Sequence, residues 1–568
     1  MTRDAANPLS AASQALADKS RRLTPPGMVS CLFGRAPVED LAQYTPDALA
    51  SLATSAHEHL MAPRRPGHWD IRLLDFEMVT EEHRREYTVV QVVNDDMPFL
   101  LDSTLSELTE QGFEPHLVAH PILAVKRDDA GELLEFAGEA TLTPRPSFQR
   151  ESLIHIHIDR VDAPENRERL IAGLQRVYAD VSVAVADWSK MRTRLLDVIG
   201  DYRDNPPPLP EDESEEALAF LDWIVNDNFT ILGVREYRFP DGDAAADVVE
   251  GSGLGILRDP SVKVLRRGSE LVIMTPEIRE FLQKPRALII TKANVKSRVH
   301  RRVHLDYVGV KLFAPDGTLE GELRIIGLFT ANAYTGSTAT VPFLRLKVRK
   351  ILERAEFDPK SHAGRALLNV LESYPRDELF QVEEDTLYEF ALEIMSLSDR
   401  PRVRVLARPD NFNRFVSVLV FIPKDRYDTN VRRRVTQFLA GVFEGRPSAA
   451  YPAYPEGMLA RTHVIIGRDE GETPVIDREV LENGVSAIVR TWGDALREEL
   501  MDELGGARAR QLANTYAEAF NAAYREAFDA RDAIRDIGSL ERLSEDRPRA
   551  VDLYRREGDP RTRVNLKV

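Results

Sequence analysis

The chain has 568 residues, of which 43% are hydrophobic and 29% are charged, as in a soluble globular protein of about four domains. Its formal net charge of −17 argues against nucleic acid and anionic membranes as partners, because both are bound by basic surfaces. A single cysteine, Cys31, excludes an intramolecular disulfide. The sequence shows neither a secretory leader nor a membrane-spanning apolar run, so we expect a cytoplasmic protein.

The first 84 residues are expected to form a helical, partly loose leader, with its clearest helix after a cap at Thr45. From residue 85 the pattern changes to that of an α+β domain, which we place at 85–203. Strands are indicated by REYTVVQVVND and SLIHIHIDRV, helices by PFLLDSTLSELTEQGF and PENRERLIAGLQRVYADV, and a hairpin around 128–131 by HLVAHPILAVKRD and ELLEFAG. The order β-α-β-β-α is typical of a ferredoxin-like unit of the ligand-binding ACT type.

A Pro-rich acidic stretch, DNPPPLPEDESEE at 204–216, predicts a solvated linker and a domain boundary. Beyond it we expect an α+β domain at 217–400, built on a mainly antiparallel sheet with an Asp-Gly turn at 316–317. Its strands are indicated by FTILGVREYRF, KVLRRG, LVIMTP, ALIITKA, RVHLDYVGVKLFAPDG and ELRIIGLFTANAY. Helices are expected near 342–357, 361–373 and 383–397.

A second α+β unit is predicted at 401–474, from two strands in RVRVLARPDNFNRFVSVLVFIPKD, the helix NVRRRVTQFLAGVFEG and the strand ARTHVIIGR. A heavily charged helical segment follows at 475–546. Residues 547–568 predict two strands around Gly-Asp-Pro, with no helix after them to cover their apolar face. Because such a hairpin is marginal by itself, we expect the chain to be a fragment that is interrupted within a further sheet.

The residue patterns of common active sites are absent or incomplete in this sequence. There is no P-loop and no Gly-x-Ser-x-Gly, and GSGLGILRD has the wrong spacing for dinucleotide binding. His300 and His304 lack the Glu of a zinc protease and are interpreted as packing or surface residues on one face of a strand. His155 and His157 share one face of another strand and receive the same interpretation. We interpret Cys31 as a small apolar filler and expect no metal site.

Two further polar clusters are interpreted as structural. Residues 375–378, Pro-Arg-Asp-Glu, predict a helix start with acidic side chains in its first turn. Arg408, Asp410 and Arg414 surround a turn between strands, where we expect an ion pair to order the turn. No group of residues in the sequence forms a complete active site.

Six stretches occur in the order found in the N-terminal segment of the large bacterial NAD-specific glutamate dehydrogenases, which the chain resembles from about residue 85 to residue 568. They are VVNDDMPFLLDS (92–103), FLDWIVNDNFTILGVREY (220–237), SRVHRRVHLDYVGVKLF (297–313), ELRIIGLFTANAY (322–334), SHAGRALLNVLESYPRDELFQ (361–381) and RPDNFNRFVSVLVFIPKDRYD (408–428). The resemblance implies a multidomain α+β fold, with ACT-like units flanking a PAS-like antiparallel sheet domain and with helical segments. At 547–568 it implies the start of a truncated third ACT-like unit.

The resemblance also implies the parent activity, the oxidative deamination of L-glutamate to 2-oxoglutarate and ammonia with NAD, and a homo-oligomer. In that family the glutamate-binding lysines and the Rossmann domain lie downstream of the segment that this chain resembles. No catalytic, cofactor-binding or metal residue is carried over, so we expect NAD to bind outside this chain and the chain alone to be inactive. The leading hypothesis is the regulatory and oligomerisation portion of such an enzyme. The alternative is a freestanding amino-acid-sensing or scaffold protein without catalysis.

A polar cluster lies where a strand turns into a helix in VVNDDMPFLLDS, and it consists of Asn94, Asp95, Asp96 and Asp102. We expect Asp95 or Asp96 to cap the helix that begins near Pro98, with Asp102 exposed. The alternative is an effector loop, in which carboxylates hold the ammonium group of an amino acid and helix amides hold its carboxylate. A catalytic or metal role is disfavoured, because no histidine or second acidic cluster accompanies these residues.

Overall fold

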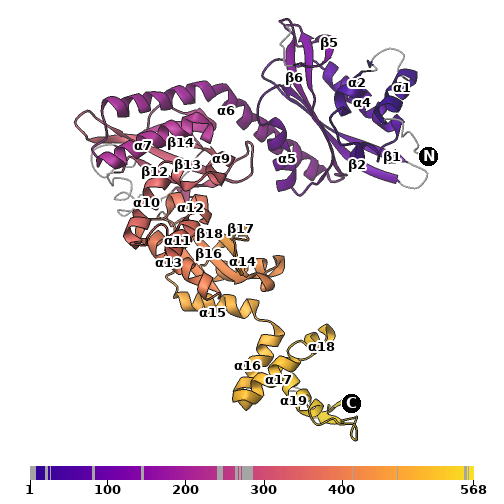
Figure 1. Ribbon diagram of the computed structural model, residues 1–568. Coiled ribbons are helices and arrows are strands. Elements are labelled where there is room, and N and C mark those ends of the chain that lie inside the picture. The colour runs from indigo at the N-terminus through magenta and orange to yellow at the C-terminus, as the bar shows by residue number, and fades with distance from the viewer. Residues whose placement is uncertain are drawn as a thin grey trace. The chain divides into compact units, whose positions relative to one another are not determined.

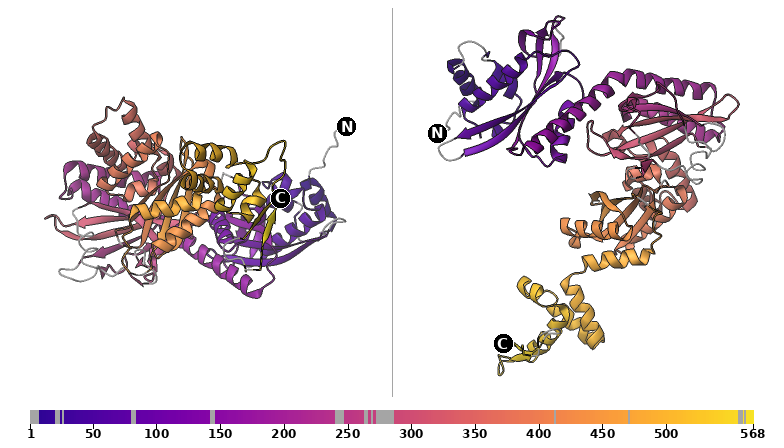
Figure 2. Two further views of the ribbon diagram at one scale, coloured as in Figure 1. Left: turned by 90° about the horizontal axis from the view of Figure 1, so that it is seen from below. Right: turned by 180° about the vertical axis from the view of Figure 1, so that it is seen from behind.

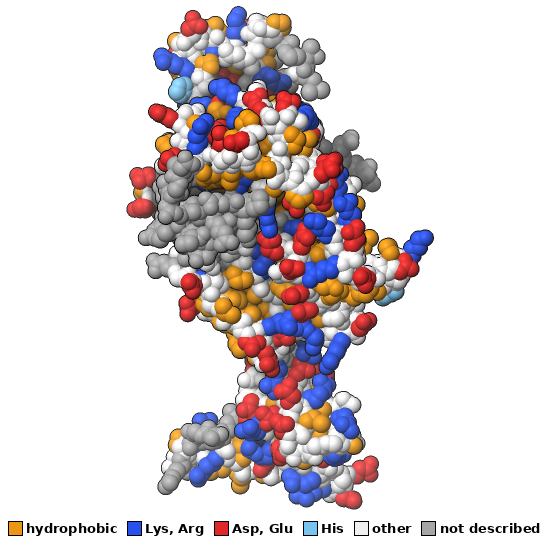
Figure 3. All heavy atoms as spheres, turned by 90° about the vertical axis from the view of Figure 1, so that its left-hand side faces the viewer, with side chains coloured by type: hydrophobic (Ala, Val, Ile, Leu, Met, Phe, Trp, Pro, Cys, Tyr) orange, Lys and Arg blue, Asp and Glu red, His pale blue; other side chains and the backbone are white. Residues whose placement is uncertain are grey.

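A computed structural model places the chain in two compact units, Met1–Ala391 and Leu392–Val568 (Figure 1). The structure describes residues 8–19, 24–25, 27–79, 84–141, 146–239, 247–262, 266–267, 270–271, 286–411, 413–469, 471–555, 560 and 562–568. None of the helices described there has both the length and the apolar character that crossing a membrane requires. On the face drawn in Figure 3, acidic and basic side chains are interspersed with apolar ones.

The first unit begins with a six-stranded antiparallel sheet whose central strands are β2 (Arg84–Asp95) and β6 (Gln149–Asp159). The strand order is β1-β2-β6-β4-β5, and β3 also pairs with β6. The other strands are β1 (Asp70–Val79), β3 (Pro115–Ala119), β4 (Ile122–Arg127) and β5 (Leu133–Glu139). The predicted β4–β5 hairpin is confirmed. Pro121, which has no N–H to donate, lies between β3 and β4, where one continuous strand is predicted.

Helices cover both faces of this sheet (Figure 1). On one face lie α5 (Leu100–Glu110) and α6 (Pro164–Asp204), the latter longer than the predicted helix. On the other face lie α1 (Pro8–Lys19), α2 (Met28–Phe33), α3 (Val38–Leu41) and α4 (Pro46–Met61). Side chains of α1, α2 and α4 share one hydrophobic core with the sheet. Apolar faces on both sides of β2 and β6 are therefore buried.

The structure differs from the expected loose leader before residue 85. β1 pairs with β2 along its length, from Asp70 opposite Val93 to Val79 opposite Arg84. The α1–α4 helices complete the core because their apolar faces and the second face of the sheet can only be buried against each other. β1 is an edge strand with the sequence DIRLLDFEMV, whose charged residues obscure the alternation that identifies a strand.

A second antiparallel sheet in the first unit has the order β12-β13-β14-β7-β8, with β9 also paired to β7. Its strands are β7 (Phe229–Arg238), β8 (Asp247–Val248), β9 (Leu254–Gly255), β12 (Leu288–Lys296), β13 (His304–Phe313) and β14 (Leu319–Phe329). The predicted Asp-Gly turn is confirmed, with Gly317 at a φ of 86°. The predicted strands KVLRRG and LVIMTP lie mostly outside the described residues. The described part of this stretch consists of β10 (Arg266–Arg267) and β11 (Glu270–Leu271), which pair with each other.

One helix precedes the strands of this second sheet in the sequence, and several helices follow them. They are α7 (Glu211–Trp223), α9 (Ala331–Thr335), α10 (Leu344–Ala355), α11 (His362–Ser373), α12 (Arg376–Gln381) and α13 (Glu384–Asp399). Phe220 of α7 and Phe380 of α12 both pack on Phe329 of β14, so the two groups of helices share one aromatic core. Because α6 ends at Asp204 and α7 begins at Glu211, the acidic Pro-rich linker is shorter than the predicted one.

The second unit is built on a four-stranded antiparallel sheet in the order β15-β16-β18-β17. Its elements are β15 (Arg404–Pro409), β16 (Phe415–Pro423), α14 (Thr429–Val442), β17 (Arg446–Ala453), β18 (Leu459–Gly467) and α15 (Arg478–Val489). Arg414 donates to the Asp410 carboxylate at 2.8 and 3.0 Å, and both side chains are buried. The predicted turn-ordering ion pair is thus confirmed. β17 was not indicated by the sequence, because it is an exposed edge strand with two prolines.

Helices and a short hairpin follow this sheet in the second unit. They are α16 (Trp492–Leu504), α17 (Gly506–Tyr516), α18 (Ala522–Ala527), α19 (Ala530–Leu540), β19 (Asp552–Tyr554) and β20 (Asn565–Lys567). The predicted charged helical segment and the pairing of the last two strands are confirmed. Thr491 and Asp494 form a capping box at the start of α16, and the apolar faces of α16, α17 and α19 form a separate small core.

Candidate functional site

The polar cluster of VVNDDMPFLLDS lies at the end of β2 and the beginning of α5, as the sequence predicts. The predicted capping role is wrong. The residue before α5 is Phe99, in a left-handed conformation with a φ of 72°, and it provides no side-chain cap for the helix. Asp95 and Asp96 cannot serve as caps because their carboxylates are held by cationic side chains from other segments.

Asp95 and Asp96 both form ion pairs at the edge of the first sheet. Arg64 donates to Asp95 Oδ1 at 2.7 Å, and the backbone N–H of Gly67 donates to Asp95 Oδ2 at 2.6 Å. Asp96 accepts from Arg150 Nε at 2.8 Å. The two carboxylates therefore connect the strand end to the segment after α4 and to β6.

Arg64 belongs to a buried charge cluster within the first sheet. The fully buried carboxylate of Glu151 accepts from Arg64 at 2.5 Å and from Arg127 at 2.7 and 2.9 Å. Arg127 also donates to the carbonyl oxygens of Leu60 and Ala62, at the end of α4. Paired buried charges of this kind hold a defined arrangement, because removing one partner leaves the other without compensation.

Asn94 is the least satisfied member of the cluster. Its side chain is 2% exposed, and Oδ1 accepts from the backbone N–H of Asp95 at 2.8 Å. Its Nδ2 has no hydrogen-bond partner among the described residues. An unpaired buried donor costs about 1–3 kcal/mol, so this amide group favours a bound acceptor atom from a ligand or a water molecule.

Asp102 is exposed, as predicted, and its carboxylate pairs with His300 of the second sheet domain. The His300 Nδ1 and Asp102 Oδ2 atoms lie 3.0 Å apart, the backbone N–H of His300 donates to Ser103 Oγ at 2.8 Å, and Ser106 Oγ donates to the His300 carbonyl at 3.2 Å. The His300 ring also packs on Phe99, with centroids 5.4 Å apart. Both aromatic residues have positive φ, at 67° for His300, which is uncommon outside glycine.

Ion pairs extend this contact along α5 and α6. Glu107 pairs with Arg302 at 3.2 Å, Glu110 with Lys296 at 3.4 Å, and Asp180 with Arg298 at 2.9 Å. We call the contacts between residues 296–302 and α5–α6 the α5 joint. It brings together two of the stretches singled out in the sequence. The prediction that His300 and His304 share a strand face is wrong, because β13 begins at His304 and His300 lies in a turn.

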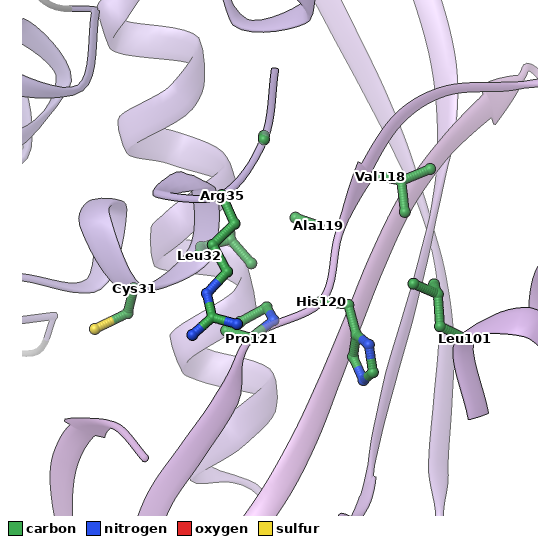
Figure 4. Close-up of a pocket in the computed structure, with 9 residues that line it drawn as sticks. Cys31, Leu32, Arg35, Leu101, Val118, Ala119, His120 and Pro121 are labelled. Carbon is green, nitrogen blue, oxygen red and sulfur yellow. The ribbon is translucent and has the colours of Figure 1, made fainter. Parts of the chain in front are cut away.

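A cavity of about 220 Å³ lies beside the N-terminal turn of α5 (Figure 4). It is lined by Cys31, Leu32, Arg35, Ala36, Leu101, Val118, Ala119, His120 and Pro121. His120 bonds to Ser152 Oγ at 2.7 Å, and burial lowers its pKa, an effect that the nearby Asp96 and Asp102 partly offset. Burial raises the pKa of the Cys31 thiol, so this residue stays protonated. Cys31, predicted to be a small apolar filler, is one of the residues that line the cavity. The sequence did not indicate this cavity.

His155 and His157 form a hydrogen-bonded chain inside the first sheet's core. Their Nε2 atoms lie 3.0 Å apart, Tyr44 OH lies 2.8 Å from His157 Nδ1, and Gln91 Nε2 lies 3.2 Å from His155 Nδ1. Burial lowers the pKa of His155 to about 3, so both imidazoles are neutral at neutral pH. Their predicted packing role is confirmed. No group of three or more His, Cys, Asp or Glu side chains in the described ranges is arranged to hold a metal ion.

A further polar cluster joins α9 and α12 to the second sheet. Lys292 Nζ lies 2.7 Å from Asp306 and 3.1 Å from Asp377, and Tyr334 OH donates to Asp377 at 2.9 Å. Burial, and to a smaller degree the Asp377 charge, raise the pKa of Asp306 to about 6 against the opposing effect of Lys292. Asp377 lies in the first turn of α12, as predicted, and its tertiary contact to Lys292 carries no local sequence signal.

Comparison with known proteins identifies four domains. The family models for "Glutamate dehydrogenase, ACT1 domain" and "Glutamate dehydrogenase, ACT2 domain" match residues 28–174 and 404–493. Those for helical motifs 1 and 2 of glutamate dehydrogenase match residues 341–400 and 499–543. The first match begins at α2, so it includes much of the predicted leader.

Several curated relatives are similar over most of the chain. The NAD-specific glutamate dehydrogenase of Halomonas elongata is 34% identical over 98% of this chain and 34% of its own length. The enzyme of the same name from Pseudomonas aeruginosa is 32% identical over 82% of this chain and 29% of its own length. That of Mycobacterium tuberculosis is 27% identical over 81% of this chain and 28% of its own length. The chain spans about a third of the length of these relatives.

Proposed function

Because this chain is a glutamate dehydrogenase-family protein by its ACT and helical-motif domains, we propose that it is the N-terminal regulatory and oligomerisation portion of an NAD-specific glutamate dehydrogenase. One observation carries the proposal: the Halomonas elongata enzyme aligns with 98% of this chain, which corresponds to 34% of that enzyme. The parent reaction converts L-glutamate, NAD and water into 2-oxoglutarate, ammonia and NADH. NAD and the catalytic residues are placed outside this chain, which is inactive alone.

The domain organisation of the proposal is supported by the two large sheets of the first unit and the one large sheet of the second. An ACT-like unit precedes a PAS-like domain, and a second ACT-like unit follows. The PAS-like assignment is supported by the antiparallel order β12-β13-β14-β7 and the helices beside it. In this proposal the portion acts in the cytoplasm, within a homo-oligomer of the parent enzyme.

Regulation is proposed to begin at the loop of Asn94, Asp95, Asp96 and Asp102, with an amino acid as effector. The unpaired Nδ2 of Asn94 and the first turn of α5, which lacks a side-chain cap, supply donors for the effector's carboxylate. The carboxylates of the loop favour its ammonium group. Occupancy then acts on the α5 joint, because Asp102 belongs to both. The charge pairs of the joint carry the signal to the second sheet.

The test of this proposal is the size of the native polypeptide in its source cells. Immunoblots with two antibodies, one against residues 85–180 and one against residues 404–493, should show the same band, much larger than the 64.1 kDa of this chain. Immunoprecipitation with either antibody should deplete glutamate-dependent formation of NADH. A native band at 64.1 kDa, with the activity left in the supernatant, would overturn the proposal and favour a freestanding amino-acid sensor or scaffold.

A further inference from the structure

The cavity beside α5 is lined by residues from three parts of the first sheet domain, and most of these residues are apolar. Leu32 comes from α2, Leu101 from α5, and Val118 and Ala119 from β3 (Figure 4). Asp95 and Asp96 do not line the cavity, and their carboxylates pair with Arg64 and Arg150. In Figure 4 the Cys31 sulfur points away from the other labelled side chains, so the thiol is not a reacting group of this site.

Arg35 is the cationic group of the cavity. Its side chain is 79% exposed and forms an ion pair with Glu139, whose side chain is 38% exposed. An ion pair so accessible to water contributes little to stability, so a ligand carboxylate can compete with Glu139 for the guanidinium group. His120 adds no positive charge to the lining at neutral pH, because burial lowers its pKa.

The size and charge of the cavity restrict the ligand. The cavity volume of about 220 Å³ is sufficient for a small ligand such as pentanoate, which has roughly seven non-hydrogen atoms. Asp96 and Asp102 act electrostatically on His120 in the lining, and their negative charge disfavours a second carboxylate. The apolar side chains favour a saturated hydrocarbon chain over a polar one.

We propose that this cavity binds a small aliphatic monocarboxylate, with the carboxylate on Arg35 and the hydrocarbon chain between Leu32, Leu101 and Val118. This proposal rests on the proposed regulatory function, and it names the class of ligand that the first sheet domain would bind. Leu101 is followed by Asp102, which binds His300 in the α5 joint. A ligand that packs on Leu101 therefore stabilises the first turn of α5 and slows amide exchange at residues 296–302.

Calorimetric titration of the full 568-residue chain with pentanoate tests the site, with hydrogen exchange as a second measurement. Leu101→Trp fills the cavity and should weaken binding about tenfold or more. Leu105→Trp is the matched control, because Leu105 is half-buried on the same helix but does not line the cavity. The pentanoate affinity of this variant should stay within about twofold of that of the unaltered chain. Equal pentanoate affinity in the two variants, or no saturable binding to the unaltered chain, would overturn the proposal.

Charge variants test the orientation of the ligand. Arg35→Gln should weaken the binding of pentanoate about tenfold and leave the binding of pentan-1-ol unchanged. Glu139→Gln should strengthen the binding of pentanoate, because it removes the carboxylate that competes for Arg35. Pentanedioate should bind more weakly than pentanoate. Tighter binding of 2-aminopentanoate than pentanoate would identify an amino acid as the natural source of the carboxylate, and weaker binding a simple fatty acid. If pentanedioate bound best, or Arg35→Gln weakened the alcohol equally, the assignment would be wrong.

These results are independent of the test of the proposed function. A native polypeptide of 64.1 kDa would overturn the regulatory portion and leave the binding measurements standing. Failure of pentanoate to bind would remove the cavity assignment and leave the identity of the parent enzyme unaffected.

Discussion

The first and second ACT-matched sheets share one strand order but differ where their second strand leads into a helix. The order β1-β2-β6-β4 in the first corresponds to β15-β16-β18-β17 in the second, and α5 and α14 follow β2 and β16. In the second sheet, Asp428 caps α14 by accepting from the backbone N–H of Val431 at 2.7 Å. In the first, α5 begins after Phe99 without a side-chain cap.

This difference shows that one fold can use the same position for local or for long-range contacts. The Asp428 side chain accepts a hydrogen bond from its own helix, as is common for acidic residues at the position before a helix. Asp95, Asp96 and Asp102 instead bind Arg64, Arg150 and His300, which lie in other segments. A missing cap and a left-handed Phe99 cost stability that the surrounding contacts must offset. The strand-to-helix connection of the first sheet therefore makes long-range contacts, and that of the second makes a local cap.

The largest expected effect is a loss of stability in the first sheet that the second sheet does not share. Glu151→Gln leaves Arg127 buried without a carboxylate and Arg64 with Asp95 alone, so the first sheet should lose about 3–5 kcal/mol of its free energy of unfolding, while the second keeps its own. Urea denaturation with hydrogen exchange read separately in β2 and β16 measures both. Glu135→Gln, an exposed change on β5, is the control and should have little effect. A loss below about 1 kcal/mol for Glu151→Gln would show that the cluster is not a stabilising centre.

Acid should also open the first sheet before the second. His155 has a pKa of about 3 when folded and an ordinary value near 6.5 when unfolded, so the unfolded chain binds the proton first as the pH falls. Its contribution is complete above pH 6.5 and declines by about 1.4 kcal/mol per pH unit down to about pH 3. Exchange in β2 and β6, compared with β16 and β18 between pH 7 and pH 4.5, measures this loss. His155→Gln should flatten the profile, and an unchanged slope would contradict the assignment.

An intermediate effect should distinguish the two helix starts. Asp428→Ala removes the cap of α14 and should destabilise its first turn by about 1 kcal/mol, seen as faster amide exchange there. Asp96→Ala breaks only a partly exposed ion pair and should leave the first turn of α5 unchanged. Faster exchange in α5 after Asp96→Ala would mean that Asp96 stabilises the helix start in spite of the observed geometry.

The smallest expected effect concerns the α5 joint. Asp102→Asn and His300→Asn should each change the free energy of unfolding by less than about 1 kcal/mol, because the contact is partly exposed. A double-mutant cycle measures their coupling energy. Each variant should nevertheless speed exchange at residues 296–302 and leave β16 unaffected. Additive effects in the cycle would show that Asp102 and His300 do not act as a pair.

The sequence predicted the elements whose patterns are long and local. β2, β6, β16 and α14 have continuous apolar or periodic runs. β2, β6 and α14 begin and end within three residues of the predicted positions, and β16 lies within the stretch predicted to hold two strands. The predicted packing of His155 and His157 follows from the same alternation. β17 and β1 were missed because prolines or charges at a sheet edge resemble loop residues. Elements of this kind are fixed by the strand beside them rather than by their own composition.

The polar cluster was located correctly by sequence and given the wrong local role. Its residues and its position between strand and helix were evident, but the partners Arg64, Arg150 and His300 are distant in the chain and carry no spacing signal. The cavity was missed for the same reason, because Arg35, between α2 and α3, and Leu101 of α5 are brought together only in the folded domain. Site residues of this kind follow from tertiary contacts and not from periodicity.

The length of α6 has a consequence for how this protein can vary. The helix contacts the first sheet domain where Tyr178 bonds to Thr104 at 2.6 Å, and the second where Asp187 accepts from Gly255 and Tyr202 donates to the Lys311 carbonyl at 2.6 Å (Figure 2). One inserted residue would rotate everything beyond it by about 100° and shift it by about 1.5 Å. The number of residues between Tyr178 and Tyr202 therefore sets the spacing and the relative rotation of these two contacts, so we expect insertions and deletions in this stretch to be poorly tolerated.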